Sequence, residues 1–203
     1  VENVAGELSS RLTDTKVTEL TITGSLDARD FKYMADKCND LTAVDLSGAK
    51  ILAYESAEPV FGQQITYQAN EIPQTSFFGK PLTSVVLPSG VRIVGYAAFA
   101  GSEGITQIEF PASLDSISGY AFSATGFSTL ALPATVTKIG EGAFSRCEKL
   151  TNATVEAGHI GAKAFFADAA LTDVKFGSGV TAIGNGAFAG CKSLATLRWS
   201  DAT

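Results

Sequence analysis

The stretch Phe127–Leu150, FSTLALPATVTKIGEGAFSRCEKL, decides the fold, because close relatives of it recur along most of the chain. Its pattern is LxxLxLPxxVxxIGxxAFxxCxx, and a further leucine then begins the next unit. The units are spaced by 21 to 24 residues, apart from one spacing of 41, and they begin at Val17, Leu41, Leu82, Ile105, Phe127, Leu150, Leu171 and Leu194.

A period of this length predicts a leucine-rich repeat solenoid, a right-handed α/β-type coil in which each unit adds one strand to a parallel, concave sheet. Short helical or irregular segments are expected on the convex side. We expect the solenoid to cover residues 17–203, with about eight units and an insertion at residues 52–71. Residues 1–16 place Val1, Val4, Leu8 and Leu12 at helical spacing, which predicts a short helix that caps the first coil.

Two features of the repeat predict how the coils stack. A proline follows the strand in three units, at Pro88, Pro111 and Pro133, and marks where each strand ends. A phenylalanine column, each member preceded by serine or alanine, predicts a spine of stacked rings along the solenoid axis. Its members are Phe77, Phe99, Phe122, Phe144, Phe165 and Phe188. An aromatic box for a cofactor is the alternative interpretation of this column.

Composition excludes several classes of function. A net charge of −6 and a pI near 4.8 argue against nucleic-acid binding, which depends on clustered lysine and arginine. No apolar run approaches the ~20 residues needed to span a bilayer. The chain begins at Val1 without a methionine, so we expect that a targeting segment was removed before the numbering begins.

The cysteines and the single histidine give no catalytic or metal-binding pattern. Cys38, Cys147 and Cys191 occupy one repeat column, and the last two are two coils apart, which at about 4.8 Å per coil is too far for a disulfide. We therefore expect three reduced, largely buried thiols, no metal and no cofactor. His159 falls in a shortened turn and is expected to be exposed there. A hydrolase centred on His159 is the weakest alternative.

Two regions are candidates for partner binding. The insertion at residues 52–71, LAYESAEPVFGQQITYQANE, supplies Tyr54, Phe61 and Tyr67; it either packs over the solenoid flank or contributes to binding. On the open face of the sheet, the candidates are Asp45, Val86, Glu109, Ala131, Thr154, Lys175 and Arg198. This face is acidic near its start and basic near its end, so it is either an oriented binding surface or a solvated face.

The unit pattern LxxLxLPxxVxxIGxxAFxxCxxL resembles the BspA-like leucine-rich repeat family of bacterial surface proteins, over most of residues 72–199. The opening repeats, Lys16 to Ile51, are similar to the divergent first repeats of such proteins. The unit that begins at Leu150 departs from the pattern, because it lacks the proline and is two residues short. The resemblance implies export, a place at the cell surface and adhesion to host or bacterial partners, and it carries no catalytic residues.

These observations favour a non-enzymatic extracellular module that binds a host or bacterial surface protein or a glycan through the concave sheet, with the insertion at residues 52–71 as an additional candidate contact. The alternative is a structural spacer or stalk that presents another domain at the cell surface. The abrupt end of the sequence at Thr203, just after the strand at Trp199, suggests this alternative. An unpaired last strand is prone to association, so we expect either that further sequence follows in the native protein or that a partner covers this edge.

Overall fold

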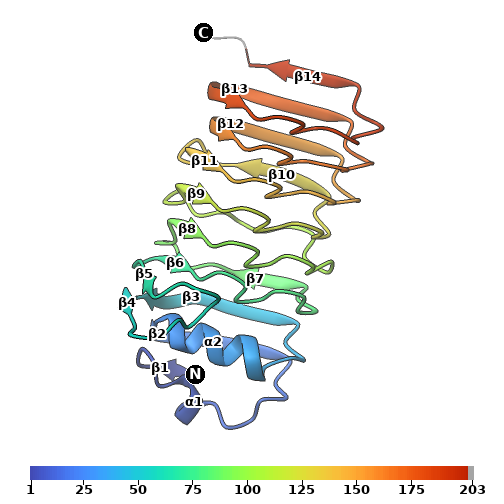
Figure 1. Cartoon of the computed structure of the whole chain (residues 1–203). Helices are drawn as coiled ribbons and strands as arrows, with labels where there is room; N and C mark the ends of the chain where they lie inside the picture. Colours follow the sequence, from blue (N-terminus) through green and yellow to red (C-terminus); the bar gives the residue numbers. More distant parts are fainter. Residues whose placement is uncertain (201–203) are drawn as a thin grey trace.

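The computed structural model describes residues 1–200 and shows an elongated stack of coils, with the N-terminus at one end and the last strand at the other (Figure 1). The elements in chain order are β1 (Glu2–Asn3), α1 (Leu8–Arg11), β2 (Glu19–Leu26), α2 (Ala28–Lys37), β3 (Ala43–Ile51), β4 (Tyr54–Glu55), β5 (Thr66–Tyr67), β6 (Glu71–Ile72), β7 (Ser84–Val86), β8 (Ile93–Val94), β9 (Ser116–Ile117), β10 (Thr129–Leu132), β11 (Lys138–Ile139), β12 (Asn152–Ile160), β13 (Asp173–Ile183) and β14 (Thr196–Trp199).

Every strand pair that joins one coil to the next is parallel, as a solenoid requires. The main strands form two groups along the stack, β1-β2-β3-β7 and β10-β12-β13-β14. A second ladder of short strands, β6-β8-β9-β11, continues into the later halves of β12 and β13. Antiparallel pairing among the described residues is confined to the insertion, where β4 pairs with β5 and Phe61 bridges Gln64.

Proline controls the lengths of the later strands. Strand β10 ends at Leu132, directly before Pro133, because proline has no amide to donate to a ladder. Strands β12 and β13 lack this proline and run on to Ile160 and Ile183. Their pairing contains register shifts, which absorb the difference in length between the two units. The expected local departure of the Leu150 unit is therefore a longer strand, and the extra residues at the two register shifts lie in its neighbour β13.

The six phenylalanines of the predicted spine stack from coil to coil. Ring centroids of consecutive members lie 5.2 to 5.6 Å apart and the ring planes differ by 1° to 14°. The first five members are fully buried, and Phe31 of α2 closes the row with an edge-on contact to Phe77 at 6.2 Å. The column is therefore hydrophobic core, and the cofactor box is not needed to explain it.

A glycine column before the spine allows the coils to approach closely. A Cβ at Gly95 would lie 2.6 Å from the carbonyl oxygen of Ile72, and one at Gly140 would lie 2.4 Å from the amide of Gly119. Any side chain at these positions would push two coils apart. Neither glycine has a positive φ, so close approach of the coils is the reason for glycine at both positions.

The N-terminal cap differs from the predicted helix. Residues 1–16 begin with the short strand β1, which pairs with β2, and only the single turn α1 is helical. Leu8 and Leu12 are buried as expected, whereas Val1 and Val4 are 39% and 48% exposed. The buried carboxylate of Asp30, in the first turn of α2, accepts hydrogen bonds from the amides of Gly6 and Leu8 and thereby fixes the cap.

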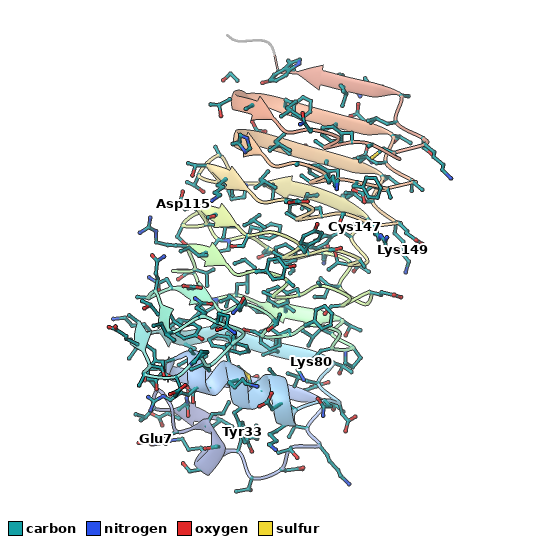
Figure 2. All side chains as sticks on the ribbon, viewed as in Figure 1. Glu7, Tyr33, Lys80, Asp115, Cys147 and Lys149 are labelled. Carbon is teal, nitrogen blue, oxygen red and sulfur yellow. The ribbon has the colours of Figure 1, made fainter. Side chains whose placement is uncertain are left out.

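Helix α2 is held at its C-terminal end by a lysine from the next coil (Figure 2). The ammonium group of Lys80 donates to the carbonyl oxygens of Cys38 at 2.9 Å and Ala35 at 3.0 Å, and Lys80 is only 5% exposed. A cation is favourable here because the last carbonyls of a helix lack partners within the helix. No helix in residues 1–200 has the length and apolar character that a bilayer crossing requires.

Candidate binding surface

One face of the main strands presents a row of side chains, one from each coil, which we call the central row. Strand pairing aligns Thr21 with Asp45 and Asp45 with Val86 in the first group of strands. In the second group it aligns Ala131, Thr154, Lys175 and Arg198. Glu109 is the corresponding residue of the coil between the two groups. Side chains alternate across a strand, so the row points away from the buried leucine and valine columns.

Every member of the central row is at least partly exposed. Asp45 and Thr154 are half-buried, and the remaining members are exposed, with Val86 reaching 43%. In most coils the inward columns beside them are buried, as Leu130 at 4% and Leu132 at 3% illustrate. The exceptions are Ile108 and Phe110, which are half-buried, and Leu197 and Trp199 of the last coil, which are 50% and 55% exposed. The structure therefore brings seven of the predicted site residues together on one face of the solenoid.

Charge is distributed unevenly along the central row. Asp45 and Glu109 lie in the first half and Lys175 and Arg198 in the second. A hydrogen bond from the Ser47 side chain, with a second from the Ser47 amide at 2.9 Å, holds the pKa of Asp45 below its usual value. Arg198 is ion-paired with Asp173 at 2.8 Å, so Lys175 is the row's cation without an ion pair among residues 1–200.

The insertion packs against α2 instead of presenting its rings to solvent. Phe61 is 4% exposed and Tyr67 is 2% exposed, and the hydroxyl of Tyr67 accepts from the Phe61 amide and donates to the Gln64 carbonyl. Arg29 of α2 lies 4.6 Å from the centre of the Tyr54 ring, and Lys32 lies 5.8 Å from that of Phe61. Of the two alternatives for this segment, the aromatic side chains support packing over the flank.

This arrangement corrects the expectation for Phe61 and Tyr67 as contact residues. Their rings are part of the core and cannot touch a partner while the insertion keeps this conformation. The half-buried Tyr54 is engaged by a cation-π contact. The composition of a loop does not reveal whether its aromatic residues pack inward, because that depends on the distant helix that receives them.

His159 also differs from its predicted setting. It lies on β12, aligned with Lys138 of β11, and is exposed on a strand instead of in a turn. Within residues 1–200 no three histidine, cysteine, aspartate or glutamate side chains come together as a metal site would require. The cysteines are free; Cys38 and Cys147 are buried and Cys191 is half-buried.

The sequence did not reveal one feature of this face, a cleft between β7 and the following coil. It has a volume of about 500 Å³, and Ser84, Val86, Leu87, Gln107, Ile108 and Glu109 are among its lining residues. The unit of Ile105 carries apolar residues in all its strand columns, yet residues 105–111 form no assigned strand. The repeat pattern contains no signal for this difference, because the pattern reports burial and not hydrogen bonding between coils.

These features define a parallel β-solenoid of the leucine-rich repeat class, with its accessible side chains arranged along one sheet face. Residues 70–197, more than half of the chain, match six copies of the BspA type leucine rich repeat region. The chain therefore belongs to the BspA type leucine rich repeat family. A comparison with curated protein sequences finds no match.

Solved structures share the fold. A leucine-rich repeat protein from Eubacterium ventriosum is 15% identical, with a TM-score of 0.53 over 92% of this chain and 74% of that chain. A leucine rich repeat protein of T. pallidum is 26% identical, with a TM-score of 0.47 over 62% of this chain and 71% of that one. A leucine rich cell surface protein from Faecalibacterium prausnitzii is 18% identical, with a TM-score of 0.44 over 91% and 65% of the two chains. Of these three, only the Eubacterium ventriosum protein has a TM-score above 0.5, and at 15% identity this similarity shows a shared fold and nothing about function.

Proposed function

We propose that this chain is a non-enzymatic module that binds a protein partner through the face of the central row. The observation that carries the proposal is the alignment of one exposed side chain per coil over two groups of strands, with acidic residues in the first half and basic residues in the second. Such a pattern gives a partner both a register and an orientation, because complementary charge favours one docking direction.

The membership in the BspA type leucine rich repeat family supports this proposal, because repeats of this class are typically binding scaffolds. We further propose that the protein acts at the bacterial cell surface. Protease treatment of intact cells tests the location: an exposed protein is digested without cell lysis, and resistance would contradict the proposed location.

Charge reversal on the sheet face tests the binding surface. The wild-type protein is first measured against a panel of host-matrix proteins, bacterial surface proteins and glycans. The double variant Lys175→Glu, Arg198→Glu is then compared with Lys149→Glu, Lys163→Glu, whose lysines are exposed but lie outside the central row. We expect at least a tenfold loss of affinity for the partner in the first variant and less than a twofold change in the second. Equal losses would place the binding surface elsewhere.

A spacer is the second candidate function, and the uninterrupted ring stack from Phe77 to Phe188 favours it, because such a stack resists bending. A spacer binds nothing in the panel, so a complete absence of partners would support it. Deletion of residues 52–71 is a poor test of either candidate, because it removes the buried Phe61 and Tyr67 together with the loop. Substitution of the exposed Gln63 and Gln68 by alanine tests the loop without damage to the core.

A further inference from the structure

The hydrogen-bond ladder between coils is interrupted on both sides of residues 107–110 on the sheet face. Elsewhere the same position bonds to the preceding coil: the amide of Thr83 donates to Thr42, that of Thr151 to Ser128, and that of Thr172 to Thr151, at 2.7 to 2.9 Å. In residues 1–200, no backbone hydrogen bond joins 83–88 to 106–111. Strand β7 pairs only with β3, and β10 pairs only with β12.

The segment between these strands has unused backbone groups. Thr106 accepts one hydrogen bond, from the amide of Ser128, and in the described part of the chain the amides and carbonyls of residues 107–110 form no backbone hydrogen bond. Backbone donors and acceptors are satisfied almost everywhere in folded proteins, so a short row of free ones at a cleft is a site for another chain or for water.

The opening is confined to the sheet side of the two coils. On the flank, Ile93 and Val94 of β8 pair with Ser116 and Ile117 of β9. In the core, the rings of Phe99 and Phe122 are stacked at 5.3 Å with planes 1° apart. The coils are thus in full contact along two of their sides and separate only at the main strands, where the cleft of about 500 Å³ lies.

The inward side chains beside the cleft confirm that the core is less covered here. Ile108 and Phe110 occupy the columns that Leu130 and Leu132 fill in the next coil. Leu130 and Leu132 are 4% and 3% exposed, whereas Ile108 and Phe110 are only half-buried. An occupant of the cleft would therefore bury apolar surface as well as pair with backbone groups.

The chemistry of the lining favours an extended polypeptide. A strand edge offers alternating donors and acceptors, and another extended backbone matches that spacing. Glu109 is the charged residue among those lining the cleft, and Asp45 lies next to Val86 in the central row, so the rim is acidic. A glycan site would need an accessible aromatic platform, but the ring of Phe110 packs edge-on against Phe122 at 5.5 Å.

We propose that the cleft between β7 and residues 106–111 binds an extended segment of a partner protein, which adds backbone hydrogen bonds to the free edge of β7 and carries a basic side chain opposite Glu109. The inference rests on the proposed protein-binding function and identifies the partner's contact segment. About three residues of the segment would lie along β7, given a rise of about 3.3 Å per residue.

Hydrogen exchange of the free protein gives the first test, because it needs no ligand. The amides of Val85 and of residues 107–110 should exchange at least a hundredfold faster than those of β12 and β13, which are paired on both sides. Equal protection in both regions would mean that the ladder is closed in solution and would overturn the inference.

Peptide binding gives the second test. A displayed library of random heptapeptides is selected on the whole chain, and the recovered peptides are measured against Gln107→Trp and Asn152→Trp. Both residues are exposed and occupy the same repeat column, but only Gln107 lines the cleft. We expect enrichment of lysine or arginine, at least tenfold weaker binding to Gln107→Trp, and less than a twofold change for Asn152→Trp. Matching melting temperatures establish that both variants fold.

Backbone chemistry distinguishes strand pairing from other contacts. N-methylation of alternate amides along one edge of a selected peptide should weaken binding at least tenfold, whereas methylation along the other edge should change it less. Peptides that bind both tryptophan variants equally, or that tolerate every methylation, would overturn the inference. If a glycan binds the wild-type protein but not Gln107→Trp, the cleft binds a glycan and the proposal of a polypeptide ligand is wrong.

The failure of this inference is distinguishable from the failure of the proposed function. If a protein from the panel loses affinity for the Lys175→Glu, Arg198→Glu variant but binds Gln107→Trp normally, the sheet face binds protein and the cleft is not the contact site. If neither change affects any partner, both proposals are wrong.

Discussion

One carboxylate oxygen of Asp168 accepts a hydrogen bond of 2.8 Å from the backbone amide of Cys147, one coil earlier in the stack. Both residues are fully buried, and Oδ2 of Asp168 has no hydrogen-bond partner among residues 1–200. Burial raises the pKa of Asp168 to about 8. At neutral pH the folded protein therefore holds this carboxyl mainly in its protonated, uncharged form, which is the form that a buried site tolerates.

Asp168→Asn should stabilise the protein, and the gain should grow as pH rises from about 4 to 8. In this window the unfolded chain ionises Asp168 while the folded chain keeps its proton, so the wild type loses stability with rising pH. The asparagine does not titrate and keeps an oxygen for the Cys147 amide. Each pH unit across the window is worth up to about 1.4 kcal/mol. Urea unfolding at pH 5, 6, 7 and 8 measures the difference.

Asp40→Asn is the control for this comparison, because Asp40 is exposed. Its effect on the free energy of unfolding should stay below about 0.5 kcal/mol at every pH. A constant difference between Asp168→Asn and the wild type across the same range would contradict the raised pKa.

Phe144→Ala should lower the free energy of unfolding by ~3–5 kcal/mol, because the ring is fully buried and stacks on Phe122 at 5.6 Å and Phe165 at 5.5 Å. Glu109→Ala, on the exposed sheet face, should change it by less than ~0.5 kcal/mol. Thermal and urea unfolding measure both. Equal shifts would mean that Phe144 does not carry core packing energy.

The repeat pattern was sufficient to predict the coils, the parallel strands and the phenylalanine spine. These features follow from side-chain burial at a fixed period, and burial is directly visible in the sequence columns. The close approach at Gly95 and Gly140 follows the same logic, because a missing side chain leaves room for another backbone to pass.

The features that could not be predicted depend on contacts between distant parts of the chain. The composition of the insertion predicts Phe61 and Tyr67 as binding residues, but both rings are buried where the insertion packs against α2. The gap beside β7 cannot be predicted from the sequence. Ile108 and Phe110 fit the repeat pattern although, among the described residues, their segment forms no backbone hydrogen bonds to the neighbouring coils. The spacing of Val1, Val4, Leu8 and Leu12 predicts a helix longer than the observed α1. It carries no information about the pairing of β1 with β2, which holds the first residues in an extended conformation.

Lys80→Met should destabilise the protein by about 1–3 kcal/mol, because it leaves the carbonyls of Ala35 and Cys38 without their donor at the end of α2. Burial lowers the pKa of Lys80, and three hydrogen bonds hold its ammonium group despite that penalty. Lys149→Met, at an exposed position, is the control and should change stability by less than about 0.5 kcal/mol. Urea unfolding followed by circular dichroism distinguishes the two, and a neutral Lys80→Met would show that water replaces the ammonium group at no cost.

Tyr67→Phe should cost about 1–2 kcal/mol without a change in shape, because it removes a hydroxyl that serves two backbone groups of the insertion. The amide of Phe61 and the carbonyl of Gln64 would then lose a buried partner while the ring continues to pack. Tyr96→Phe provides the comparison, since Tyr96 is 51% exposed and its loss of a hydroxyl should be nearly neutral. Hydrogen exchange should show faster exchange in residues 60–67 of Tyr67→Phe alone. Unchanged exchange there would mean that the cation-π contacts with α2, and not the Tyr67 hydroxyl, order the insertion.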